Sequence, residues 1–196
     1  GGLGGDNIEL KHGGDDIVVI SDDAESGYAL TGSVIGFVNV DTIHNFDFAG
    51  EWQNGQTLGS WGAGDSYIEG DLIALRYRSD DMRVQKLIGD SGIAVSNEYD
   101  ALRALSNLAA FNVENGDNSF LRESYTDAVF VEVTSNSADK SFEGYYLIVN
   151  TDLNAGFDAA NDTGMRFVWD TPEDAAANLL AVTKGSFYHD PTDGAL

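Results

Sequence analysis

The sequence predicts a mainly β protein with two short helices. Its first twenty residues, GGLGGDNIELKHGGDDIVVI, are glycine-rich turns carrying aspartate, each followed by a short β-branched run. Further apolar runs recur between Gly, Asn and Asp clusters, which is the pattern of a protein built from many short strands. The 196 residues, 42% of them hydrophobic, are enough to enclose a core. We expect two parts, a repeat region at 1–48 and a β-rich domain at 49–196.

Strands are expected where β-branched and aromatic residues gather between turn-forming residues. These runs lie at 17–20, 34–40, 71–77, 128–133, 145–149 and 165–169. Their spacing favours an antiparallel sandwich or roll for the larger part.

Two segments carry helical signals instead. In 97–111 the apolar residues fall three and four apart on one face, with Asn97 placed to cap the amino end. In 171–182 Thr171 is the expected cap, Pro172 takes the first helical position, and two acidic residues suit the positive helix end.

The opening residues form a repeat. Residues 1–9, GGLGGDNIE, match the nonapeptide G-G-x-G-x-D-x-U-x, where U is a large apolar residue, at every specified position. Nine residues later Gly13, Asp15 and Ile17 keep the same register without the glycine pair. Each repeat is expected to end in a strand whose middle side chain points inward.

The repeat chemistry predicts calcium. Glycines let backbone carbonyls converge on one point, and aspartate supplies charge. Such an all-oxygen, flexible set suits Ca²⁺ rather than Zn²⁺. The expected ligands here are Gly1, Gly2, Gly4, Asp6, Gly13 and Asp15. A pair of glycine-rich hairpin turns is the alternative.

A second acidic loop, NTDLNAGFDAAND at 150–162, alternates oxygen-bearing side chains in a way that can direct them to one centre. Its candidate calcium ligands are Asn150, Asp152, Asn154, Asp158 and Asp162. Gly156 permits a bend, although it sits one place later than in an EF-hand loop, and no glutamate closes the loop. A hairpin loop closed by Asx-turns is the alternative.

Charge and composition exclude several classes of partner. Thirty-three acidic residues against ten basic ones give a net charge of −23, which disfavours nucleic acid and anionic membranes and favours divalent cations. The chain has no cysteine, and no apolar run approaches the roughly 20 residues of a membrane span. We therefore expect no nucleic-acid binding and no membrane insertion.

The tetrapeptide GDSG around Ser91 is the one protease-like signature. Ile93 and Ala94 follow it where a chymotrypsin-like protease has Gly-Pro, so Ser91 is expected in a β-turn between two strands. Other catalytic motifs are absent from the sequence. We expect no catalytic residues and no enzymatic activity.

The long loop at 49–67 carries Trp52 and Trp61. Aromatic side chains beside acidic and amide groups can stack on sugars, so a calcium-dependent carbohydrate-binding module is one alternative function. Core packing or a subunit contact is the other interpretation of these tryptophans.

Three further stretches resemble the RTX family of exported proteins. VDTIHNFDF at 40–48 with EGDLIALRY at 69–77 is similar to the pair that closes RTX rolls, and 144–170 is similar to a C-terminal hairpin found in many of them. The resemblance implies a short calcium-binding parallel β-roll stub ahead of the antiparallel domain, with more repeats upstream. It also implies passage through a type I secretion apparatus.

Together these features predict a non-catalytic, calcium-dependent structural module of a bacterial extracellular or cell-surface protein, such as a surface layer, filament or adhesin. The chain would fold and self-associate on meeting extracellular Ca²⁺. The alternative is the C-terminal export and folding module of a secreted protease or lipase whose catalytic domain lies upstream.

Overall fold

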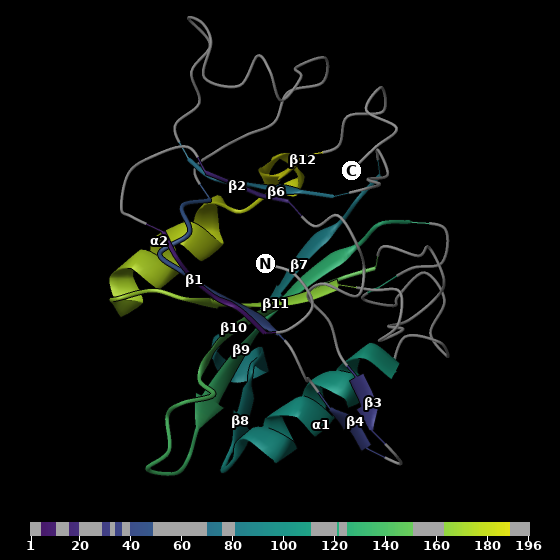
Figure 1. Ribbon diagram of the computed structural model, residues 1–196, viewed down its shortest axis with the longest axis vertical. Coiled ribbons are helices and arrows are strands. Elements are labelled where there is room, and N and C mark those ends of the chain that lie inside the picture. The colour runs from purple at the N-terminus through teal and green to yellow at the C-terminus, as the bar shows by residue number, and fades with distance from the viewer. Residues whose placement is uncertain are drawn as a thin grey trace, which may run out of the picture.

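The protein is mainly β with two short helices (Figure 1). The computed structural model describes residues 5–10, 16–19, 29–31, 34–36, 40–48, 70–75, 81–110, 121, 125–150 and 163–188. The helices are α1 (Glu98–Ala110) and α2 (Pro172–Ala181). Within the described residues, no helix has the length and apolar character needed to cross a membrane.

The largest described sheet is mixed and has seven strands. In spatial order they are β1 (Asn7–Glu9), β5 (Asp41–His44), β11 (Thr163–Val168), β10 (Gly144–Val149), β9 (Ala128–Ser135) and β7 (Val84–Leu87), with β8 (Ile93–Val95) also beside β9. Antiparallel pairing, the expected arrangement, holds for β9, β10 and β11. The other pairs are parallel, since long connections let each chain segment return in the same direction.

Two smaller sheets complete the described strands. One is parallel and contains β12 (Phe187–Tyr188), β6 (Leu72–Ala74) and β2 (Ile17–Val19). The other is an antiparallel pair, β3 (Ala29–Thr31) and β4 (Val34–Gly36), which lies beside α1 (Figure 1). All six predicted strand regions therefore contain a strand, and residues 20, 37–39, 76 and 77 of these regions lie outside the described residues.

Both predicted helices and their caps are confirmed. The Asn97 side chain accepts the backbone N–H of Asp100 at 2.9 Å, and the Thr171 side chain accepts that of Asp174 at 3.1 Å. Pro172 opens α2 as expected, because a proline there leaves no helical hydrogen bond unmade.

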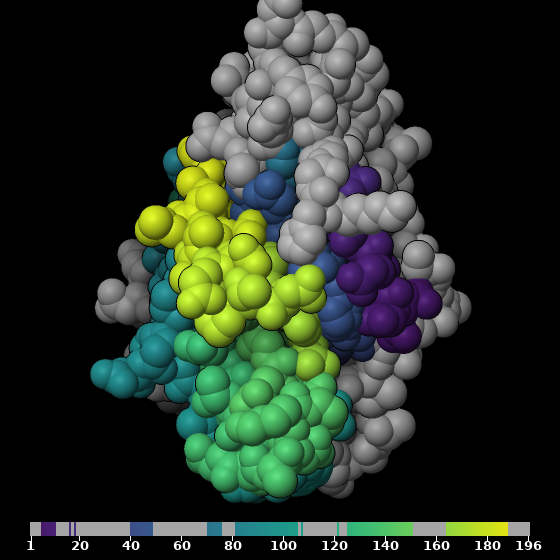
Figure 2. Space-filling view, turned by 90° about the vertical axis from the view of Figure 1, so that its left-hand side faces the viewer, coloured from purple at the N-terminus to yellow at the C-terminus, as the bar shows by residue number. Residues whose placement is uncertain are grey.

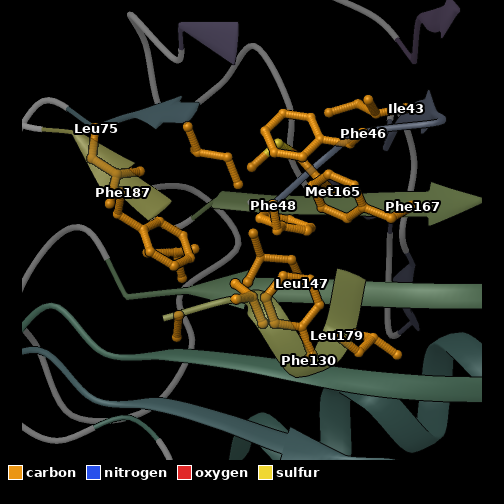
Figure 3. Close-up of a cluster of buried hydrophobic side chains, with 14 of the residues drawn as sticks. Ile43, Phe46, Phe48, Leu75, Phe130, Leu147, Met165, Phe167, Leu179 and Phe187 are labelled. Carbon is orange, nitrogen blue, oxygen red and sulfur yellow. The ribbon is translucent and has the colours of Figure 1, made fainter. Parts of the chain in front are cut away.

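The two faces of the large sheet are covered by different clusters of buried side chains. One face packs against α2 and the β2–β6–β12 sheet around an aromatic group shown in Figure 3. The other packs against α1 through Ala101 and Leu105. At the centre of the first cluster, the Phe48 ring lies 4.4 Å from that of Phe46 and 5.4 Å from that of Phe130.

Residues on both sides of the boundary expected at residue 48 share the first cluster. Phe46 and Phe48 come from the amino-terminal part, whereas Phe130 and Phe167 come from the larger part, and all four are fully buried. In the described structure, side chains from both parts pack into one core. The division into two parts stays a prediction.

Candidate functional site

Four strands begin with the same short pattern, an aspartate followed two residues later by an inward-facing Ile or Val. The pairs are Asp6 and Ile8 at β1, Asp16 and Val18 at β2, Asp41 and Ile43 at β5, and Asp71 and Ile73 at β6. The register places Ile8 opposite Ile43 and Val18 opposite Ile73. The apolar members all join the first cluster, so the pattern anchors each strand to the same core.

The aspartates of β5 and β6 have identical hydrogen-bonding roles. Asp41 Oδ1 accepts the backbone N–H of Asp6 at 2.8 Å, and Asp71 Oδ1 accepts that of Asp16 at 2.9 Å. A backbone hydrogen bond follows in each pair. The Thr42 N–H donates to the Asp6 carbonyl, and the Leu72 N–H donates to the Asp16 carbonyl. The carboxylate thus satisfies a backbone donor that lies just outside the regular ladder.

Asp127 repeats this arrangement in the middle of the large sheet. It accepts the backbone N–H of Arg83 at 2.9 Å at the entry of the parallel β7–β9 pair. The Arg83 guanidinium also lies 3.1 Å from the fully buried Asp127 carboxylate. An aspartate at the entry of a parallel ladder therefore has a structural role in this fold, whatever else it binds.

The second repeat is offset by one residue from the register read from the sequence. Asp16, rather than Asp15, occupies the place equivalent to Asp6, and Val18 rather than Ile17 aligns with the buried Ile73. The spacing from Asp6 to Asp16 is ten residues, because the connection contains one residue more than a nonapeptide. Side chains alternate along a strand, so a shift of one residue changes which residue of β2 lies beside Ile73.

The predicted calcium ligands are only partly described. Asp6 precedes β1, and Asn150 is fully buried directly after β10, with its N–H donating to the Asp127 carbonyl at 2.9 Å. The others lie outside the described residues: Gly1, Gly2, Gly4, Gly13, Asp15, Asp152, Asn154, Asp158 and Asp162. Among the residues the structure describes, no group of three or more His, Asp or Glu side chains forms a metal centre.

Asp71 is a buried carboxylate with a raised pKa. It is 4% exposed, and its second oxygen accepts the N–H of Asp47 at 2.7 Å. Burial raises the pKa of Asp71 to about 6, and the nearby carboxylates of Asp16 and Asp47 add to the rise, while its two backbone hydrogen bonds oppose it. A cation beside this group would relieve the repulsion. The sequence contained its signal in the resemblance at 69–77, although Asp71 was not among the predicted ligands.

A second polar group lies at the opposite ends of the strands. Asn45 follows β5, adopts a positive φ of 59° and is 7% exposed. Its Nδ2 donates to Glu9 Oε1 at 3.3 Å and to Asp170 Oδ2 at 3.5 Å. His44 lies alongside, with Nε2 2.8 Å from Asn7 Oδ1. The sequence analysis did not find this group, because its members are far apart in the chain.

A cavity of about 480 Å³ opens between the ends of β9, β10 and β11 and the amino end of α2. The rings of Tyr145 and Trp169 meet edge to face at 5.5 Å beside it. Tyr145 donates to Glu132 Oε1 at 3.3 Å, and burial together with that carboxylate raises the pKa of Tyr145 to about 12. Its aromatic and charged lining, which includes Arg166, suits a small polar molecule.

Ser91 lies in a short 3-10 turn, Gly89–Ser91, between β7 and β8, as the sequence predicts. Its hydroxyl donates to the Ile88 carbonyl at 2.8 Å. His44 on β5 is separated from β8 by β11, β10 and β9, which is about 19 Å at the usual strand spacing. This His44–Ser91 pair therefore lacks the geometry of a catalytic couple, and the absence of activity stays a prediction.

Comparison with known proteins found no family model, no curated protein and no solved structure that matches this chain.

Proposed function

We propose that the protein is a non-catalytic, calcium-dependent structural module of an exported bacterial protein, acting at the cell surface or outside the cell. The observation that carries this proposal is the pair of parallel ladders, β1 with β5 and β2 with β6, each opened by two aspartates in register. The RTX resemblance supports the same proposal and adds type I secretion. A surface layer, filament or adhesin is the setting that such a module suits.

The charge of the chain explains why calcium would act as the trigger. A net charge of −23 opposes compaction, and the ladders place aspartates next to each other. Each Ca²⁺ removes two units of negative charge where it binds. Binding energy then contributes to folding, so millimolar extracellular calcium would stabilise a chain that low cytosolic calcium leaves uncompensated.

Two sheet edges offer surfaces for self-association. β1 ends the described large sheet, and β2 ends the described parallel sheet of three strands. Figure 2 shows β1, in purple, beside β5, in blue, on one face of the molecule. Backbone donors and acceptors at a sheet edge can pair with a further strand. Neutralisation by calcium would lower the repulsion between two copies of this acidic chain and allow such edges to approach.

The proposal is tested by far-UV circular dichroism and sedimentation velocity in EDTA, in Mg²⁺ and in Ca²⁺. Calcium should increase the β-sheet signal and produce assemblies, whereas equimolar Mg²⁺ should substitute poorly because it prefers a tighter octahedral shell. An identical spectrum and a monomer in all three solutions would refute calcium-dependent folding and assembly.

A carbohydrate-binding role is the second candidate, favoured by the cavity beside Tyr145 and Trp169. Aromatic side chains with a few polar groups among the lining residues can hold a sugar ring. The tryptophans that first suggested this role, Trp52 and Trp61, lie outside the described residues. Calorimetric titration of neutral hexoses with wild type and Tyr145→Ala tests it. Equal or undetectable heats for both proteins would exclude sugar binding in this cavity.

A further inference from the structure

We propose that a cavity of about 320 Å³ between α1 and the large sheet binds a small aliphatic α-amino acid. Arg166 on β11 holds the carboxylate of this ligand, and Glu98, the first residue of α1, holds its ammonium group. The site is separate from the predicted calcium positions, and the proposal does not rest on calcium-dependent folding.

Three neighbouring strands place polar side chains on the same face of the sheet. Tyr146 of β10 lies opposite Arg166 of β11, and Arg166 lies opposite Thr42 of β5. Side chains opposite each other on neighbouring strands share one face of a sheet. Tyr146 belongs to the buried cluster that includes Ala101 and Leu105 of α1, so this is the face that α1 covers.

The helix and the segment before β5 supply the rest of the wall. Glu98 and Leu102 both line the cavity and are four residues apart, which places them on the same side of α1. Val40, directly before β5, lines the cavity as well. The cavity therefore has an acidic group from α1, a basic group from β11, and apolar surface at Val40 and Leu102 for an aliphatic side chain.

Arg166 is arranged to receive a carboxylate. Its Nε donates to the Glu143 carbonyl at 3.0 Å, and its Nη2 donates to the same oxygen, which fixes the orientation of the guanidinium group. Arg166 is half-buried, and it forms no ion pair with any carboxylate of the described residues. The remaining N–H groups can bind a carboxylate with two parallel hydrogen bonds, the geometry that a guanidinium group favours.

Arg166 and Glu98 act on one point in the cavity without forming an ion pair with each other. Burial raises the pKa of Tyr146 to about 12, while the charge of Arg166 opposes this rise and the charge of Glu98 adds to it. Both charges therefore lie near the Tyr146 hydroxyl, although the structure records no ion pair between these two described residues. A ligand with a positive and a negative group can contact both.

An α-amino acid matches this arrangement of groups. Its ammonium and carboxylate groups are attached to the same carbon atom, so one small molecule carries both charges at short separation. The half-buried Thr42 hydroxyl has no hydrogen bond to the described residues and can donate to the ligand carboxylate. Polar groups that fix orientation beside apolar surface are the usual composition of a small-molecule site.

Ligand-observed NMR titrations of the full chain test the proposal with L-valine, N-acetyl-L-valine and isobutylamine. The second compound lacks the ammonium charge of L-valine and the third lacks its carboxylate. We expect L-valine to bind about tenfold more tightly than either, because only L-valine satisfies both charged residues. No binding of L-valine, or equal affinity for all three compounds, would overturn the proposal. Equal L-valine binding in EDTA and in Ca²⁺ would refute calcium-driven folding while supporting this site.

Two variants assign the binding to this cavity. Arg166→Gln should weaken L-valine binding about tenfold, and Glu98→Gln should weaken it about three- to fivefold because its carboxylate is exposed. Arg103→Gln and Glu173→Gln are the matched controls, since each removes the same charge from an exposed position that does not line the cavity. Equal affinities in the site variants and their controls would overturn the proposal.

Glu98→Gln is the decisive variant of the two. Arg166 also lines the larger cavity beside Tyr145, and its bonds to Glu143 contribute to folding, whereas Glu98 is exposed and does not line the larger cavity. Weaker L-valine binding in Glu98→Gln, with an unchanged circular dichroism spectrum, would support the cavity at α1. Wild-type affinity in this variant would refute it.

Discussion

Replacing Asp71 with asparagine should change the pH dependence of stability in the calcium-free protein. The folded protein binds the Asp71 proton more tightly than the unfolded chain does, because the pKa rises from 3.8 to about 6 on folding. The contribution of this group to the free energy of unfolding therefore falls as the pH rises from about 4 to about 6, and is constant above that range.

The size of the effect follows from the shift. The full change in pKa corresponds to about 3 kcal/mol at 1.36 kcal/mol for each pKa unit, and solvent screening reduces this to about 1–2 kcal/mol. Asparagine cannot ionise, so Asp71→Asn should remove the contribution of Asp71 to the pH dependence of the free energy of unfolding. The variant also loses one of the two acceptor oxygens that bind the N–H groups of Asp16 and Asp47, which lowers its stability by a pH-independent amount.

Urea unfolding in EDTA, measured between pH 4 and pH 7, distinguishes these two effects. Asp90→Asn is the matched control, since Asp90 is exposed in the turn before β8 and its replacement should leave the wild-type slope in place. Parallel stability curves for wild type and Asp71→Asn across this range would refute the reasoning. Calcium that binds beside Asp71 should flatten the wild-type curve by stabilising the ionised form.

Three other changes have definite expected outcomes. Asp6→Asn should raise the calcium concentration at the midpoint of folding followed by circular dichroism, and an unchanged midpoint would remove Asp6 from the ligand set. Phe48→Ala should lower the free energy of unfolding by about 3–5 kcal/mol in urea, because the ring is fully buried among other aromatic rings; a loss below about 1 kcal/mol would contradict that packing. Ser91→Ala should change stability by no more than about 0.5 kcal/mol, and labelling of wild-type Ser91 by a fluorophosphonate probe would contradict its expected inertness.

Local sequence predicted both helices and the strands within the six β-branched runs, whereas β3 and β12 lie outside those runs. The caps at Asn97 and Thr171 and the apolar spacing behind them predicted both helices, since helix formation depends on residues within a few positions of each other. The β-branched runs likewise located strands, including β9 and β10. The mainly β class of the protein follows from these local preferences.

Local sequence did not determine which strands pair with one another. β1 pairs with β5 and β5 with β11, although more than a hundred residues separate the last two strands in the chain. The antiparallel arrangement expected for the larger part therefore holds for β9 to β11, whereas the other strand pairs of the large sheet are parallel. Alternating apolar residues show that a strand exists and which face is buried, but they do not specify its neighbour.

The same distinction between local sequence and tertiary structure applies to the candidate sites. The sequence by itself determined the acidic character of the chain, the glycine–aspartate repeat with Asp6, and the calcium chemistry that these residues predict. Only the tertiary structure aligned Asp16 with Asp71 and brought Asn45 to Glu9 and Asp170, which are 36 and 125 residues away in sequence. The physical reason is that a motif records neighbours along the chain, whereas a coordination site requires neighbours in space, which the order and direction of the strands decide.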